Sequence, residues 1–204
     1  MEQRSAEWFA ARIGKVTASK INDVMAKLKS GGEAAVRKNY RVQLAVERLT
    51  GQREESYING AMQWGIDNED SAREAYSFIS GCEVEQIGFI DHPSISMAGC
   101  SPDGLIGCFG MVEIKCPNTA THVEWMLAGK VPPEHVNQMM FQMDCAGRSW
   151  CEFVSYDPRL PLDLQLFVKR LEMDIPQTMR IREEVELLLS EVSAMVVQLE
   201  SLRA

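Results

Sequence analysis

The stretch from Ser96 to Pro117 reads S-M-A-G-C-S-P-D-G-L-I-G-C-F-G-M-V-E-I-K-C-P, a Pro-Asp-Gly turn followed by a short apolar run. Successive side chains of a strand point to opposite faces. The run therefore predicts Glu113 and Lys115 on one face of a strand, with Val112 and Ile114 on the other. Burial of the apolar face then fixes the direction in which the two charged side chains point.

The turn residue Asp103 joins Glu113 and Lys115 in the pattern P-D-x(9)-E-x-K. Two carboxylates and an ammonium brought together across a hairpin are the groups that a divalent-metal phosphodiesterase needs. The carboxylates are hard oxygen ligands for Mg²⁺, and the ammonium lies near the attacking water. The same pattern also occurs on a solvated strand face with a surface ion pair. The motif alone leaves both interpretations open.

The composition limits the class of protein. The chain has 204 residues, 46% hydrophobic and 25% charged, which suits one soluble domain over 1–204. No apolar run is long enough to cross a bilayer and the polar start has no signal-peptide core, so we expect a cytoplasmic protein without membrane contact. Six cysteines without a C-x-x-C pair argue against zinc or iron–sulfur sites. The net charge of −8 argues against non-specific coating of nucleic acid, but not against a nuclease with a basic groove.

Hydrophobic periodicity and turn residues predict helices interspersed with short strands. The predicted helices cover 5–13, 21–28, 34–49, 60–80, 119–127, a segment that starts at 131–133, and 175–202. The predicted strands cover 83–91, the arms of the hairpin, 150–156 and 164–171.

Three of these segments carry polar residues that could face the hairpin. Glu69 could supply a third carboxylate, and His135, Gln138 and Gln142 fall on neighbouring turns as one polar stripe. Arg12 precedes a helix start with hydroxyls and free N–H groups, a combination that can hold a phosphate. The alternatives are an exposed glutamate, a surface stripe and an ordinary helix cap.

Five segments occur in one order: R-I-G-K-V-T-A-S at 12–19, W-G-x-x-x-E at 64–69, C-S-P-D-G at 100–104 with E-I-K-C-P at 113–117, the helix around Gln138, and Y-D-P-R at 156–159. Together they resemble the lambda exonuclease or YqaJ-type viral recombinase nucleases of the PD-(D/E)xK superfamily. One position departs from the pattern. Many relatives place a tyrosine about one turn before the helix glutamine, where this chain has His135.

This resemblance implies an α/β fold with a restriction-endonuclease-like core, in which helices flank a mixed central β-sheet. It implies a Mg²⁺-dependent exodeoxyribonuclease that degrades one strand of linear double-stranded DNA from its 5′ end. Such an enzyme releases mononucleotides and leaves a 3′ single-stranded tail for a single-strand annealing protein. The resemblance also implies two Mg²⁺ ions, replaceable by Mn²⁺, and a ring-shaped homotrimer in the cytoplasm of a bacterial host.

By the same resemblance, Asp103 and Glu113 are implied as metal ligands, together with the backbone carbonyl of Ile114. Lys115 would position or activate the water, and Glu69 would support the second metal.

The remaining implied roles concern the DNA. Gln138 would orient the nucleophile or the strand. Arg12, Ser19 and Ser101 match positions that hold the terminal 5′ phosphate. The helix over 175–202 would be a lid on the sheet or an oligomer contact.

Two other functions remain open at this point. A related endonuclease or a CRISPR-associated iron–sulfur nuclease could use the same core, although Cys145 and Cys151 are too few and wrongly spaced for a cluster. A non-catalytic DNA-binding recombination scaffold is the other alternative. Its weakness is that a scaffold has no use for a set of metal-binding carboxylates beside Lys115.

Overall fold

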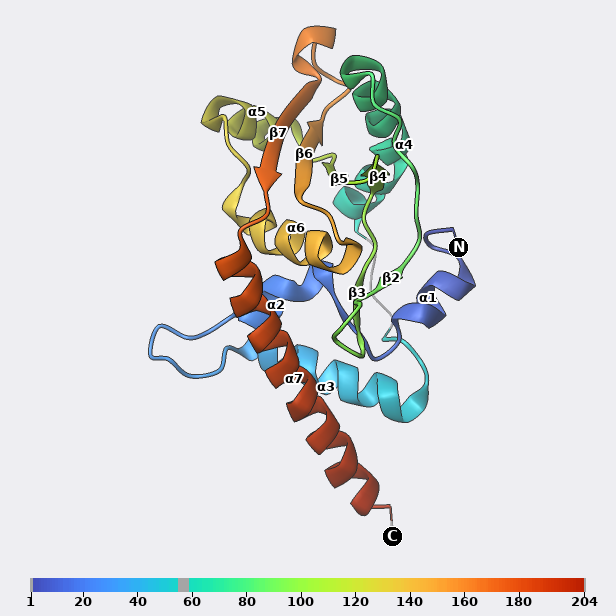
Figure 1. The fold of residues 1–204 in the computed structure, drawn as a ribbon, viewed down its shortest axis with the longest axis vertical. Coiled ribbons are helices and arrows are strands. Elements are labelled where there is room, and N and C mark those ends of the chain that lie inside the picture. The colour runs from blue at the N-terminus through green and yellow to red at the C-terminus, as the bar shows by residue number, and fades with distance from the viewer. Residues whose placement is uncertain (1, 55–58, 204) are drawn as a thin grey trace.

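The computed structural model describes residues 2–54 and 59–203, and it alternates helices with short strands (Figure 1). The helices are α1 (Ala6–Arg12), α2 (Ile21–Met25), α3 (Ala35–Thr50), α4 (Gly60–Ser80), α5 (Thr119–Ala128), α6 (Pro133–Ala146) and α7 (Ile175–Ser201), with 3-10 turns η1 (Ala18–Lys20) and η2 (Leu162–Leu164). The strands are β1 (Val16–Thr17), β2 (Ile90–Asp91), β3 (Ala98–Cys100), β4 (Gly104–Ile106), β5 (Gly110–Lys115), β6 (Trp150–Tyr156) and β7 (Leu166–Glu172).

The strands form two hydrogen-bonded sheets. The larger sheet has the order β4-β5-β6-β7, and the smaller has the order β1-β3-β2. In the larger sheet β5 is antiparallel to β4 and parallel to β6. Parallel neighbours need a crossover connection, and here α5 and α6 provide it. The predicted mixed α/β class, with helices flanking the sheet, is confirmed.

The two faces of β5 meet different helices. On one face Met111 belongs to the main core together with Met139 and Met143 of α6. On the other face Val112 and Ile114 pack in a second core with α4, which runs beside the β4–β5 end of the sheet in Figure 1. The alternation predicted for the hairpin is therefore confirmed, and the charged face of β5 lies on the side of α6.

Local capping explains why α4 has the predicted bounds. The Asn59 side chain accepts the backbone N–H of Met62 at 2.9 Å, and Gly81 ends the helix at a φ of +68°. A side-chain oxygen before the first turn and a glycine in the left-handed region after the last are both readable in the sequence. The two caps therefore fix where α4 begins and ends.

The predicted helix over 21–28 is wrong at its C-terminal end. α2 stops at Met25, and the chain turns back through a bridge between Lys27 and Glu33. Leu28 is 51% exposed because it lies in this turn, where its backbone carbonyl accepts the N–H of Gly31. The spacing of Leu28 from Val24 matches a helix face that the chain does not form.

The predicted strand over 83–91 is also mostly wrong. Only Ile90 and Asp91 pair with β3, and Glu85 forms an isolated bridge with Leu105. The partner strand β3 is three residues long and ends its pairing at Cys100 opposite Ile90. Alternating residues before Ile90 therefore have no neighbouring strand to complete a ladder.

α7 packs one apolar side against α3 and α6 and then extends away from the body of the protein (Figure 1). Glu191 of α7 links this helix to α3, because the Glu191 carboxylate accepts hydrogen bonds from Arg37 at 2.7 Å and from Arg41 at 2.8 Å. No helix in the described part of the chain is long and apolar enough to span a membrane.

Candidate active site

Glu113 lies at the centre of a buried polar cluster. It is 1% exposed, and three donors surround its carboxylate. Gln138 donates to Oε1 at 2.6 Å, Gln142 donates to Oε2 at 2.7 Å, and the Lys115 ammonium pairs with Oε1. The two glutamines are one turn apart on α6, so they reach the same carboxylate from one helix face. The polar stripe predicted on this helix therefore faces the site.

Asp103 reaches the same cluster from the turn before β4. Its Oδ2 accepts the backbone N–H of Ile114 at 2.7 Å. This N–H is available because β4 pairs with β5 only as far as Val112. Burial, and next the charge of Glu113, raises the pKa of Asp103 well above its usual value.

The ammonium form of Lys115 is favoured in this cluster. Burial lowers the pKa of Lys115, but the neighbouring charges of Glu113 and Asp103 outweigh burial, so the net pKa is raised. The ammonium is therefore paired directly with Glu113 and lies in the field of a second acid, Asp103. Such a pair of carboxylates attracts further positive charge, and hard carboxylate oxygens suit a divalent cation such as Mg²⁺.

Glu69 of α4 is near the cluster but is bound to arginines. Its Oε1 accepts from Arg73 at 2.8 Å and its Oε2 from Arg4 at 2.6 Å. Arg73 also donates to the backbone carbonyl of Asp103 at 3.1 Å, which ties α4 to the turn. Over residues 2–54 and 59–203, no three His, Cys, Asp or Glu side chains are close enough together to hold a metal. The charges of the three acids are balanced here by Lys115, Arg73 and Arg4.

Two cavities flank these acids. One of about 500 Å³ is lined by Asp103, Glu69, Lys115 and His135, and one of about 440 Å³ lies on the Arg73 side of Asp103 and Glu69. His135 stacks on Phe153 with ring centroids 5.3 Å apart. Burial, and then the charge of Lys115, lowers the pKa of His135, so its neutral form is favoured.

Two of the predicted phosphate-holding residues contact each other, and one of them, Ser101, is two residues from Asp103 along the chain. Arg12 and Trp8 donate to the Ser101 hydroxyl at 3.0 and 2.9 Å, and the Arg12 guanidinium lies 4.1 Å from the Trp8 ring centroid. Arg12 and Ser19 line one cavity of about 440 Å³. Ser19 contacts the Thr17 hydroxyl at 3.3 Å. The structure therefore joins Arg12 to Ser101 directly and places Ser19 on the same cavity.

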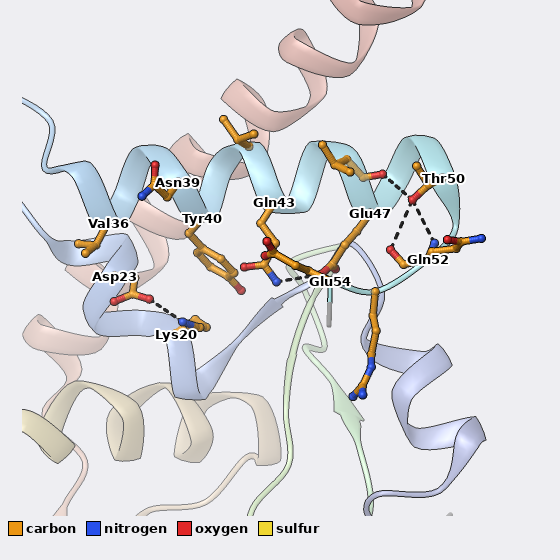
Figure 2. A pocket seen from close by; sticks show the side chains of 13 residues that line it. Lys20, Asp23, Val36, Asn39, Tyr40, Gln43, Glu47, Thr50, Gln52 and Glu54 are labelled. Atoms are coloured by element: carbon orange, nitrogen blue, oxygen red, sulfur yellow. Dashed lines mark hydrogen bonds and ion pairs between the residues drawn. The ribbon is translucent and has the colours of Figure 1, made fainter. Parts of the chain in front are cut away.

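A larger cavity of about 660 Å³ lies elsewhere, along α3 (Figure 2). None of the residues predicted for the site lines it, and its polar groups include the ion pair between Lys20 and Asp23. It shares Tyr40, Gln43 and Glu47 with the cavity that holds Arg12. Cavity size alone therefore does not mark the active site, and the grouped carboxylates do.

Three residues that contact the acids, Gln142, Arg73 and Arg4, were not predicted from the sequence as site residues. Gln142 lay in the predicted stripe without an assigned role, and Arg73 follows Glu69 by four residues, a spacing that places both on one helix face. Arg4 gave no local signal, because its contact with Glu69 joins positions 65 residues apart.

The chain is similar to known proteins over most of its length. The model of the YqaJ-like viral recombinase domain matches residues 7–149. LHK-Exo, an alkaline exonuclease from Laribacter hongkongensis, is 49% identical, with a TM-score of 0.90 and 97% of each chain covered; one of its crystal structures contains dAMP. A phage-related exonuclease from Haemophilus somnus 129PT shares the fold at 14% identity and a TM-score of 0.71, covering 91% of this chain and 96% of its own. Among curated proteins, none is significantly similar. The family match and the 49% identity over almost the whole chain show that this chain belongs to the YqaJ-like viral recombinase family, as a nuclease of the phage exonuclease type.

Proposed function

We propose that this chain is a Mg²⁺-dependent 5′ to 3′ exodeoxyribonuclease that acts on the ends of linear double-stranded DNA. It releases mononucleotides and leaves 3′ single-stranded tails. The observation that carries the proposal is the grouping of Asp103, Glu113 and Lys115. Asp103 lies two residues along the chain from Ser101, whose hydroxyl accepts a hydrogen bond from Arg12.

Asp103, Glu113 and the backbone carbonyl of Ile114 would hold one divalent cation, and Glu69 would support a second. In a strand the N–H and C=O of one residue point toward the same edge. Because the N–H of Ile114 donates to Asp103, the carbonyl of Ile114 also points toward the side of Asp103. Two bound Mg²⁺ ions, or Mn²⁺ in their place, would polarise the attacking water and offset the charge on the leaving 3′ oxygen.

Other side chains hold the reacting groups in place. The Lys115 ammonium, fixed by Glu113, orients the water and stabilises negative charge near it. Gln138 and Gln142 fix the Glu113 carboxylate, since each donates to a different oxygen. Gln138 is the more exposed of the two and is placed to orient the strand as well.

Release of single nucleotides follows from the distance between the two sites. Two residues of extended chain span at most about 7 Å, so the Cα atoms of Ser101 and Asp103 are no further apart than this. A terminal 5′ phosphate held by Arg12, Ser19 and Ser101 then leaves the next phosphodiester near Asp103. The dAMP bound to LHK-Exo is a nucleoside 5′-monophosphate, the class of product expected from such cleavage.

The proposed partners are double-stranded DNA ends, a single-strand annealing protein and two further copies of the chain in a homotrimer ring, in the cytoplasm of a bacterial host. The end of α7 supports a contact between copies, because Val197 and Leu202 are exposed apolar residues.

Digestion of a linear duplex labelled at both ends, with Mg²⁺ or with EDTA, tests metal need, polarity and strand choice together. We expect loss of the 5′-labelled nucleotide first, only with the metal, and no cleavage of a covalently closed circle. Cleavage of the circle would instead identify an endonuclease. Retained nucleotide release by Asp103→Ala would refute the assigned site.

A further inference from the structure

The N-terminal turn places a charged side chain in the catalytic cleft. Arg4 has a φ of +68°, in the left-handed region that disfavours residues with a Cβ. Gln3 holds this turn in place, since its side-chain amide donates to the backbone carbonyls of Ile87 at 2.9 Å and Pro102 at 2.8 Å. Pro102 immediately precedes Asp103, so the turn is fixed against the segment that carries the proposed metal ligand.

Arg4 borders both cavities of the cleft, each of which is also lined by Glu69 and Asp103. Its Nη2 donates to Glu69 Oε2 at 2.6 Å, and its side chain is 44% exposed. A partly exposed ion pair contributes little stability, so this contact does not offset the cost of a left-handed backbone. Strain of this kind concentrates at functional sites, and the position of Arg4 points to a role in the cleft.

The two arginines on Glu69 differ in how firmly they are held. Arg73 is 11% exposed and donates to Glu69, to Asp70 and to the backbone carbonyl of Asp103. Arg4 makes one side-chain hydrogen bond within the described ranges, the one to Glu69. Arg4 is therefore the cation that can leave Glu69 without breaking other contacts.

This inference rests on the proposed metal-dependent nuclease activity. We propose that Arg4 exchanges Glu69 for a phosphate of the DNA strand once Glu69 binds a divalent cation. A cation on Glu69 repels the guanidinium, and a backbone phosphate of DNA bound in the cleft offers it two oxygens in place of the carboxylate. Guanidinium groups bind phosphate through two parallel N–H donors. Arg4 thus balances the charge of Glu69 before a divalent cation binds, and it contacts the DNA phosphate afterwards.

Metal binding tests the first half of the exchange. Arg4→Gly removes the guanidinium and relieves the left-handed strain, so the variant keeps its fold. By isothermal titration calorimetry without DNA, we expect Arg4→Gly to bind Ca²⁺ about threefold more tightly, because the competing charge is gone. Arg4→Lys keeps the charge and should bind Ca²⁺ like the wild type. A weaker or unchanged Ca²⁺ affinity in Arg4→Gly would mean that Arg4 only holds Glu69 in place.

DNA binding tests the second half. With Ca²⁺ present, fluorescence anisotropy of a 5′-phosphorylated duplex should show about tenfold weaker binding by Arg4→Gly, and a salt-dependence slope lower by about one phosphate contact. Arg4→Lys should retain the slope. Arg170→Ala is the matched control, because Arg170 is 48% exposed in an ion pair with Glu152 on the other strands of the sheet. An unchanged slope in Arg4→Gly would overturn the proposal.

The two proposals fail separately. If Asp103→Asn still releases nucleotides with Mg²⁺, the proposed function is wrong. If Asp103→Asn is inactive while Arg4→Gly binds Ca²⁺ and DNA like the wild type, only the role of Arg4 is wrong.

Discussion

Gln142 donates its side-chain N–H to Oε2 of Glu113 at 2.7 Å, and both residues are 1% exposed. The Oε1 atom of Gln142 is buried and has no hydrogen-bond partner among the described residues. The hydrogen bond to Glu113 therefore sets the orientation of the Gln142 amide. A buried carboxylate with donors on both oxygens is held in one position, which a metal ligand requires.

Gln142→Ala leaves Glu113 Oε2 without its donor. We expect at least about tenfold slower nucleotide release, because the ligand loses its orientation. We also expect a loss of about 1–3 kcal/mol in the free energy of unfolding, because a buried acceptor is unsatisfied. Steady-state rates on a linear duplex and urea unfolding measure the two effects. Gln198→Ala, an exposed truncation on α7, should change neither, and equal effects from both variants would contradict this role.

Asp103→Asn should abolish activity and yet stabilise the metal-free protein. The raised pKa of Asp103 means that its ionised form is less favoured in the folded chain than in the unfolded chain. The contribution of Asp103 to stability in EDTA should therefore increase as the pH falls through its raised pKa, since the folded carboxyl binds the proton more tightly than the unfolded one. We expect the melting temperature of Asp103→Asn in EDTA to be about 2–4 °C above wild type at pH 7. A lower melting temperature would show that the carboxylate is needed for folding.

Arg12→Ala should remove the preference for a 5′ phosphate. A charge-assisted bond of this type contributes about 1.5–3 kcal/mol, so kcat/KM on a 5′-phosphorylated end should fall about 10-fold to 100-fold. The same variant assayed on a 5′-hydroxyl end is its own control and should change little. Equal losses on the two ends would exclude a contact between Arg12 and the phosphate.

His135 should make the stability sensitive to acid. Because its pKa is lowered below the usual 6.5, the unfolded chain binds more protons near that pH. The contribution of His135 is present above about pH 6.5 and is lost as the pH falls through the lowered pKa. His135→Phe keeps an aromatic ring beside Phe153 but cannot be protonated. Between pH 7.5 and 5.5, urea unfolding should therefore show a change in free energy of unfolding that is less favourable for the wild type than for His135→Phe. Equal losses would place the acid sensitivity elsewhere.

Local signals were sufficient for some elements. The bounds of α4 and the alternation of β5 follow from residues within each segment, such as the cap at Asn59 and the spacing of Glu113 and Lys115. The same signals failed where a partner was missing. Leu28 continues the helical spacing of α2, but the chain turns back at that point. Residues 83–91 alternate like a strand, but β3 is too short to pair with most of them.

The sequence by itself determined that Asp103, Glu113 and Lys115 share one hairpin and that a glutamine stripe lies on one helix face. Their periodicity records which face is buried, and this is a property of each segment alone. Only the tertiary structure decided that Gln142 reaches Glu113, that Arg12 reaches Ser101, and that Arg4 reaches Glu69. These contacts join positions 29 to 89 residues apart, so they depend on how the helices pack against the sheet. No pattern within a single segment encodes that packing.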